Sequence, residues 1–128
     1  MSLVHAEIHL KNLTNTSLMP CTVTSLVDTG ALHLCIPEHV AIQLGFDCGV
    51  ADKREVTIAS GERMLCPYVG PVEISFSNRK CFSGALVIGN EVLLGAIPME
   101  DMDLIVHPAK LALLVNPDSP NIPASTVK

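Results

Sequence analysis

The sequence predicts an all-β barrel or sandwich that carries one or two short helices. Apolar and polar residues alternate with a period of two over several short segments, which is typical of half-buried strands. Turn-forming residues interrupt these segments about every ten residues, as they do in small β-barrels and sandwiches. The chain has 128 residues, a length that fits one domain.

The first part of the chain predicts two strands and then a helix. Residues 4–10 and 21–27 alternate apolar and polar side chains, and a short apolar run follows at 32–36. Residues 37–45 predict a helix of about two turns, because Pro and Glu stand in its first turn and Gly follows its end. Its expected buried stripe is Val40, Ala41 and Leu44.

The middle of the chain predicts a hairpin. Residues 55–59 and 63–68 resemble strands, and Ser60-Gly61 supplies the turn between them. The segment 78–80 predicts a further turn between two strands. The remaining expected strands are 72–76, 81–88, 92–94, 104–106 and 111–115.

The end of the chain predicts a short helix and a tail. The helix is expected over residues 98–103, where Glu100, Asp101 and Asp103 would cap and solvate it, since their spacing lacks the pattern of a calcium loop. The three prolines after Asn116 predict an extended, poorly ordered segment. We therefore divide the chain into a domain over 1–116 and a tail over 117–128.

Composition excludes several classes of protein. Eight Lys and Arg against 13 Asp and Glu give a net charge of −5, and aromatic residues make up 3%, so nucleic acid is not an expected partner. Apolar residues make up 48%, yet no run approaches the length of a membrane span. The apolar surplus is expected in a core and in a subunit interface.

The five cysteines are scattered and contain no CxxC pair, which favours buried, reduced thiols over a zinc ribbon or a disulfide framework. With no secretory pattern in the first residues, the expected compartment is the cytoplasm. His33 and Cys35 lack a second pair of ligands nearby, so we expect neither a metal ion nor a cofactor.

The candidate chemistry lies in Asp28-Thr29-Gly30, which directly follows an apolar strand. Taken alone the tripeptide is a weak signal, because Asp, Thr and Gly all suit a turn. Its context is more informative. The hairpin around Ser60-Gly61 follows it, and then Leu93-Leu94-Gly95 and a short helix.

This order of motifs resembles the retropepsin-like aspartic proteases. The stretches LVDTGALHLCIPEHVAIQLGF and LLGAIPMEDMDLIVHPAKLALLVNP are similar to an uncharacterised bacterial and archaeal group of that clan, and the resemblance covers about residues 4–116. It implies an acid-protease barrel in which Asp28, Thr29 and Gly30 are catalytic. It also implies that Leu93, Leu94 and Gly95 lie under the active site.

The same resemblance implies a hairpin flap over the substrate. Ala31, Ala59, Ser60 and Gly61 would then bind substrate, although the stretch 57–63 has one Gly where family flaps are often Gly-rich. Glu62 and Arg63 would meet the substrate or be ordinary solvated turn residues. Ala31 stands where many relatives carry Ser or Thr, from which we expect a mildly acidic pH optimum.

Hydrolysis by aspartates needs two carboxylates that share one proton, and this chain has one Asp-Thr-Gly. A second Asp28 must therefore come from a second copy across a two-fold axis, with Thr29 hydrogen-bonded across it. The sequence thus predicts a homodimeric peptidase that acts on peptides or proteins. For Val4, Ile8, Leu111, Leu113 and Val115, interface and ordinary core remain equal alternatives.

Two rival functions stay open on the sequence alone. The chain is alternatively an inactive peptide-binding or dimerisation module of the same fold, because a fold does not determine a function. A metal-dependent hydrolase is the third class, and it would require bound zinc or iron.

Overall fold

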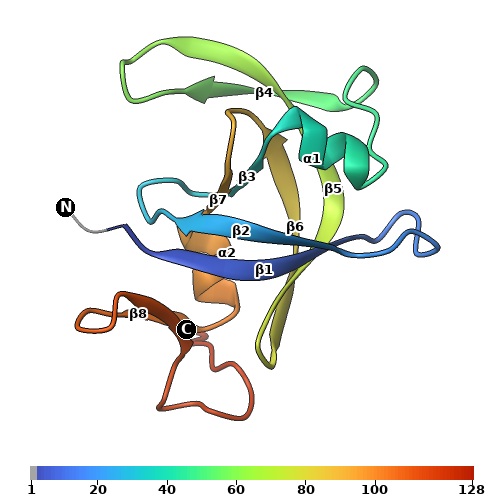
Figure 1. Cartoon of the computed structure of the whole chain (residues 1–128). Helices are drawn as coiled ribbons and strands as arrows, with labels where there is room; N and C mark the ends of the chain where they lie inside the picture. Colours follow the sequence, from blue (N-terminus) through green and yellow to red (C-terminus); the bar gives the residue numbers. More distant parts are fainter. Residues whose placement is uncertain (1–2) are drawn as a thin grey trace.

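The computed structural model describes residues 3–128 and shows a closed β-barrel with a projecting hairpin (Figure 1). The largest sheet has seven strands in the order β1-β2-β7-β3-β6-β5-β4, and an additional pairing of β1 with β5 closes six of them into a barrel. Its strands are β1 (His5–Asn12), β2 (Cys21–Val27), β3 (Leu34–Ile36), β4 (Asp52–Thr57), β5 (Arg63–Phe76), β6 (Arg79–Val87) and β7 (Val92–Leu94). The all-β prediction is confirmed.

Alternation along β1 explains why this strand lies across the core. Ala6, Ile8 and Leu10 are buried while the residues between them face outward. One edge of β1 pairs with β2 and the other with β5, so both edges are covered. Of the alternatives for the terminal strands, Ile8 and Leu113 belong to the core.

Two short helices, α1 (Glu38–Gln43) and α2 (Ala96–Asp101), follow β3 and β7. Val40, Ala41 and Leu44 are buried as predicted. The buried Asn12 side chain donates a hydrogen bond of 2.8 Å to the Leu44 carbonyl, which fixes the end of this helical segment against β1. The second helix begins two residues before the expected 98, because Gly95 is its N-cap.

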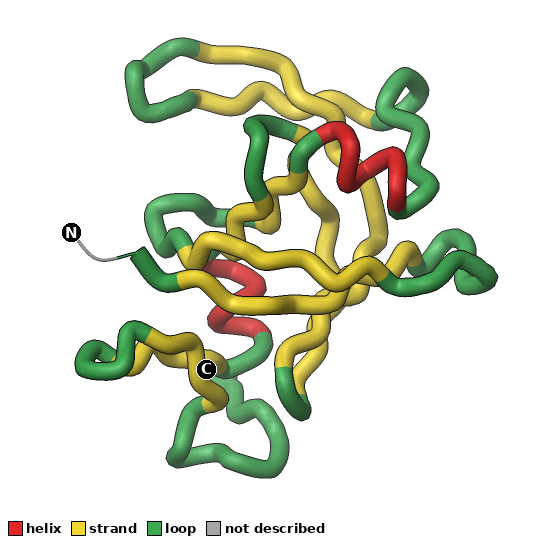
Figure 2. The backbone as a smooth tube through the Cα atoms, viewed as in Figure 1, coloured by secondary structure: helices red, strands yellow, loops and turns green. Residues whose placement is uncertain are grey.

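The predicted strands 63–68 and 72–76 are one strand, β5, with a register shift between Val69 and Val72. The end of β5 lies in the barrel wall, while its beginning pairs with β4. β4 and the start of β5 thus form a hairpin that projects from the barrel at the top of Figure 2. At the other end lies a two-stranded sheet of β8 (Leu104–His107) and β9 (Ala112–Val115).

The structure corrects three expectations for charged and terminal residues. Arg79 is not part of the turn expected at 78–80 but begins β6, with its side chain fully buried. Asp103 follows α2 and neither caps nor solvates it. Leu111 is not part of a strand, because it stands before β9 with a left-handed φ of 50°.

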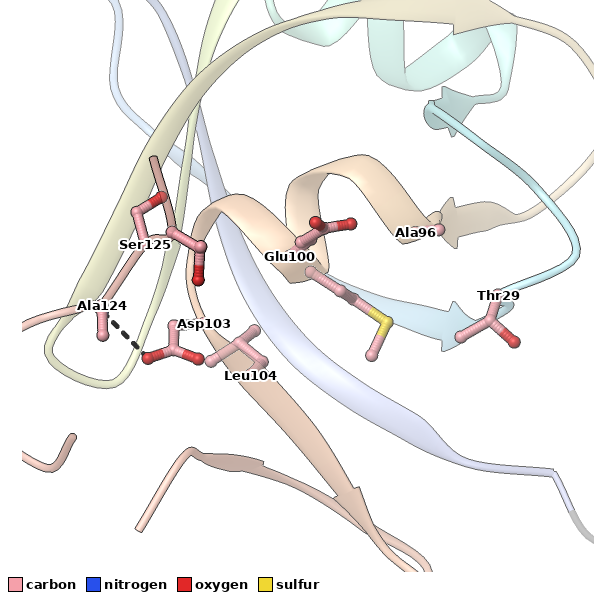
Figure 3. A pocket seen from close by; sticks show the side chains of 9 residues that line it. Thr29, Ala96, Glu100, Asp103, Leu104, Ala124 and Ser125 are labelled. Carbon is pink, nitrogen blue, oxygen red and sulfur yellow. Dashed lines mark hydrogen bonds between the residues drawn. The ribbon is translucent and has the colours of Figure 1, made fainter. Parts of the chain in front are cut away.

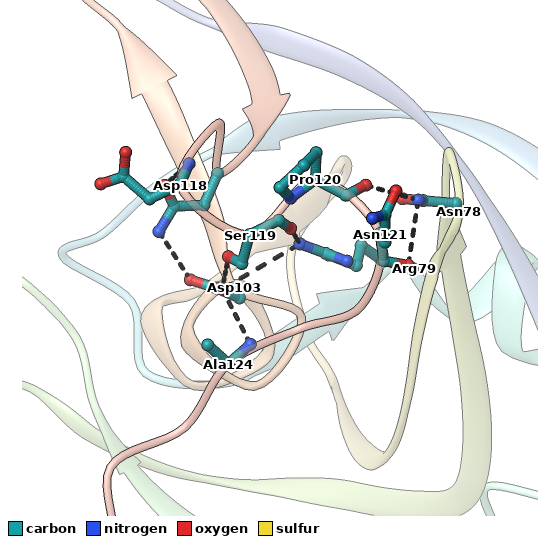
Figure 4. A network of polar contacts seen from close by, with 9 residues as sticks. Asn78, Arg79, Asp103, Asp118, Ser119, Pro120, Asn121 and Ala124 are labelled. Atoms are coloured by element: carbon teal, nitrogen blue, oxygen red, sulfur yellow. Dashed lines mark hydrogen bonds and ion pairs between the residues drawn. The ribbon is translucent and has the colours of Figure 1, made fainter.

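The segment after Asn116 folds back onto the barrel instead of extending away from it (Figure 4). Asp103 accepts hydrogen bonds from the Asn116 amide (3.1 Å), the Ser119 hydroxyl and the Ala124 N–H (2.9 Å). Arg79 donates to the Ser119 carbonyl and has Asp103 4.0 Å away. The tail therefore supplies one acceptor to the buried Arg79, whose Nε and Nη1 have no hydrogen-bond partner among the described residues. The domain boundary at residue 116 stays a prediction.

The Asp103 network predicts a pH-dependent contribution to stability. Hydrogen bonds from Ser119, Ala124 and Asn116, with a smaller effect of Arg79, lower the pKa of Asp103 from 3.8 to about 2. A lowered pKa stabilises the fold above the ordinary pKa, and the contribution is lost as the pH falls toward the lowered value. Asp103→Asn should therefore lower the melting temperature at neutral pH, and the difference from wild type should shrink from about pH 5 downward.

Thermal unfolding followed by circular dichroism between pH 7 and the acid limit of folding measures this difference. Asp118→Asn is the matched control, since Asp118 is exposed in the same segment and forms no ion pair among residues 3–128. A gap between Asp103→Asn and wild type that stays constant at all pH values would contradict the prediction.

Candidate active site

Asp28 begins a tight loop where β2 ends. Its N–H donates to the Leu94 carbonyl at 3.0 Å, which continues the parallel pairing of β2 with β7 by one residue. Its carbonyl accepts from the Ala31 N–H at 3.1 Å and closes the turn. The loop thus leaves the barrel at a position that the sheet determines.

A hydrogen bond within the loop orients the Asp28 carboxylate. Oδ1 accepts from the Gly30 N–H at 2.9 Å, the side-chain-to-backbone bond that Asp commonly forms two residues ahead. A Cβ at Gly30 would lie 3.1 Å from the same oxygen, so glycine leaves room for the carboxylate. Asp28 is half-buried, and Thr29 beside it is exposed.

β7 and α2 support this loop from below. The N–H groups of Ala96 and Ile97 donate to the carbonyls of Ala31 and Leu32, both at 2.9 Å. A Cβ at Gly95 would lie 2.4 Å from the His33 carbonyl oxygen and 2.8 Å from that of Ala31. Gly95 is therefore required for the close approach of the two backbones.

The role of Leu93, Leu94 and Gly95 under an active site stays a prediction, and the structure gives their positions beside the loop. Leu94 is fully buried and holds the Asp28 N–H, while Leu93 is half-buried and lines the cleft. Leu93 also pairs with Cys35 of β3, so β7 joins β2 to β3 directly beneath the loop.

A cleft of about 920 Å³ extends from Asp28 to the β4–β5 hairpin. Ala31 and Ala59, two of the predicted substrate-binding residues, line it. Ser60 and Gly61 form the hairpin tip outside this lining, where the Gly61 N–H donates to the Ile58 carbonyl at 2.8 Å. Their role in binding stays a prediction.

The two strands of the hairpin are joined by an exposed ion pair. Arg63 Nη1 lies 3.7 Å from Glu55 Oε1. Arg63, which the sequence left between substrate contact and solvated turn, thus binds the neighbouring strand, whereas Glu62 is exposed and its carbonyl accepts from the Ile58 N–H.

Arg54 and His33 line the cleft and Tyr68 contacts both, a group that the sequence did not predict. The Arg54 guanidinium lies over the Tyr68 ring, with Cζ 3.9 Å from the ring centroid. The His33 and Tyr68 rings meet edge to face, with their centroids 6.4 Å apart. The strand register shows how they come together: Arg54 lies opposite Cys66, so Tyr68, two residues further along β5, is its diagonal neighbour.

The cysteines are free, and four of the five are buried. Burial raises the pKa of Cys35 in the cleft wall, and Cys66 and Asp28 raise it further by charge. Burial also raises the pKa of Cys81 to about 12. Protonated thiols are poor nucleophiles, so cysteine chemistry does not account for the cleft.

Neither metal-ligand grouping nor a membrane span emerges from the described chain. Within residues 3–128, no three His, Cys, Asp or Glu side chains form a group that could hold a metal ion. Over the same residues, no helix has the length and apolar character needed to cross a membrane.

A second hollow, of about 440 Å³, lies on the other side of Thr29 (Figure 3). Ala96 and Glu100 of α2 line it together with Ala124 and Ser125 of the tail. Asp103 holds Ala124 there through the backbone hydrogen bond drawn in Figure 3. The exposed Thr29 thus stands between the cleft and a hollow that the tail helps to form.

Comparison with solved structures relates this geometry to a known fold. The crystal structure of a retropepsin-like aspartic protease from Rickettsia conorii superposes with a TM-score of 0.59 over 88% of this chain and 91% of that chain, at 18% sequence identity. No family model matches the sequence, and no curated protein matches it either. The likeness shows that the chain has a retropepsin-like fold.

The support under the loop predicts that Gly95 tolerates no side chain. Gly95→Ala forces a methyl group against two backbone carbonyls, so we expect a loss of at least about 1–3 kcal/mol in the free energy of unfolding. Urea denaturation measures the loss. Gly49→Ala is the control, because its Cβ would meet one side-chain oxygen at 3.2 Å in an exposed loop. Equal stability of the two variants would contradict the prediction.

Proposed function

We propose that this chain is a homodimeric aspartic endopeptidase, in which paired Asp28 carboxylates activate water to hydrolyse a peptide bond. The observation that carries the proposal is the placement of Asp28. Its carboxylate is fixed by the Gly30 N–H on a loop supported by β7 and α2, at one end of a cleft covered by a hairpin. The retropepsin-like fold supports the same reading.

The proposed chemistry needs two carboxylates that share one proton. The ionised Asp28 takes a proton from water as the water oxygen attacks the peptide carbonyl carbon, and the protonated Asp28 of the second subunit gives its proton to the carbonyl oxygen. Transfer of a proton to the amide nitrogen then releases the amine and leaves a carboxylic acid.

Exposed apolar residues beside the loop support a dimer. Leu32 is 62% exposed and Ile97 is 47% exposed, and a backbone hydrogen bond joins the two residues. They flank the same loop as the exposed Thr29. A second copy of the chain would cover all three and bring its own Asp28 close to the first.

The cleft supports an extended peptide as substrate. Its volume of about 920 Å³ lies between the Asp28 loop and the inner side of the hairpin. The hairpin is a two-stranded extension that can close over a bound chain and exclude water. The five free cysteines support a reducing compartment, for which we propose the cytoplasm.

Replacement of the carboxylate tests the chemistry. Asp28→Asn should lower the rate of peptide cleavage by at least about 10²–10⁴-fold, because it removes the acid and base together, while the dimer persists. Cleavage of a peptide library followed by mass spectrometry measures the rate, and sedimentation velocity measures the dimer.

Mixing the two proteins tests whether one site uses both subunits. An equal mixture of wild type and Asp28→Asn, after subunit exchange, should retain about a quarter of the wild-type activity, because mixed dimers are inactive. An unchanged rate in Asp28→Asn would overturn the peptidase. Peptide binding without cleavage by wild type would favour the inactive module.

A charge in the apolar patch tests the interface. Ile97→Asp should weaken the dimer by at least about tenfold and lower cleavage in parallel, because the interface would bury an unpaired carboxylate. Ile42→Asp is the matched control, since Ile42 is 62% exposed on the other helix. Sedimentation over a range of concentrations measures both dimers. Equal affinity of the two variants would place the interface elsewhere.

A further inference from the structure

The side of the β4–β5 hairpin that faces the cleft carries a cation, Arg54, that the proposed hydrolysis does not use. Along β4 and the residues after it, Val56 and Ile58 are half-buried, whereas Arg54, Glu55 and Thr57 are exposed. Because side chains alternate along a strand, Arg54 shares the inward face of Val56 and Ile58, and all three line the cleft.

Arg54 is held in place by a stack of aromatic rings. Its Cζ lies 3.9 Å from the centroid of the Tyr68 ring. That ring covers the backbone of Gly84 so closely that a Cβ there would lie 2.1 Å from it, and the His33 ring meets its edge. Tyr68 is therefore fixed by the barrel wall, and it orients the guanidinium through a cation–π contact.

The guanidinium has no acidic partner in the described chain. Over residues 3–128 the ion pairs join Arg63 to Glu55 and Arg79 to Asp103, and Arg54 takes part in neither. Stacking covers one face of its plane and leaves the N–H groups at its edge free. That edge matches the two oxygens of a carboxylate.

The other charged groups of the cleft make Arg54 distinctive. Asp28, Glu55 and Glu91 line the cleft with carboxylates, and Arg54 is the one arginine or lysine in its lining as described. An acidic side chain of a substrate would be repelled along most of this cleft and attracted at Arg54. Such an arrangement would favour a substrate with an acidic residue at one position and would disfavour acidic residues at the other positions.

We infer that Arg54, stacked on Tyr68 beside His33, forms a subsite for an Asp or Glu side chain of the substrate. The inference rests on the proposed peptidase and names its substrate class: peptides with an acidic residue at a defined distance from the cleaved bond. The two-fold axis of the proposed dimer repeats the subsite, so the preference occurs on both sides of that bond.

Matched peptides test the subsite in the active enzyme. Peptides that differ in a single Glu or Gln, scanned along the sequence, should show about tenfold higher kcat/KM for Glu at the favoured position, the usual effect of a hydrogen bond to a charged group. Arg54→Ala should abolish this ratio through KM. Arg54→Lys, which keeps the charge but not the planar fork, should recover part of it.

The control removes a charge from the same hairpin. Arg63→Gln takes an equal charge from the same hairpin and should keep the Glu preference, because Arg63 does not line the cleft. Melting temperatures show that each variant is folded. Equal kcat/KM for Glu and Gln at every position in wild type, or a preference that survives Arg54→Ala, would overturn the subsite.

Binding to an inactive protein separates this inference from the peptidase itself. Fluorescence anisotropy with Asp28→Asn measures the affinity for the same labelled peptides without cleavage. Tighter binding of the Glu peptide that disappears in Asp28→Asn/Arg54→Ala supports the subsite even if wild type cleaves nothing. Equal binding of the Glu and Gln peptides would overturn it even if wild type is an active peptidase.

Discussion

The passage of β7 beneath the Asp28 loop is the constraint on which the other features depend. This three-residue strand pairs with β2 on one side and β3 on the other, and Leu94 accepts the N–H of Asp28. The next residues of the chain then donate to Ala31 and Leu32. The same pairings therefore close the barrel, start α2 and position the carboxylate. Gly95 allows the two backbones to approach closely because it has no side chain.

The cleft combines a rigid side with an adaptable one. The Asp28 loop is hydrogen-bonded to the barrel at each end, whereas the tip of the flap is an exposed hairpin with few buried contacts. Arg54 is intermediate in rigidity between the Asp28 loop and the hairpin tip. It pairs with the buried Cys66 near the place where the hairpin leaves the barrel. The stiffness of the barrel thus extends to Arg54 and not to the exposed tip.

Local patterns in the sequence predicted the strands, the hairpin around Ser60-Gly61 and the turn at Asp28, because alternation and turn residues act over neighbouring positions. Arg79 and Asp103 were misjudged for the opposite reason. A charged residue beside a turn is ordinarily solvated, and the carbonyl that accepts a hydrogen bond from Arg79 belongs to Ser119, 40 positions away. The stack of Arg54 on Tyr68 was missed as well, since it depends on the register between β4 and β5 and on the bare backbone of Gly84.

The dependence of Arg79 on residues near the C-terminus affects how the chain folds as it is made. Synthesis proceeds from the N-terminus, and β6 leaves the ribosome well before Ser119. Before the segment around Ser119 has been made, a buried Arg79 side chain would lack the carbonyl that accepts its hydrogen bond. We therefore expect the strand end at Arg79 to be one of the last parts of the barrel to lose its water. It should stay hydrated until the segment around Ser119 has left the ribosome.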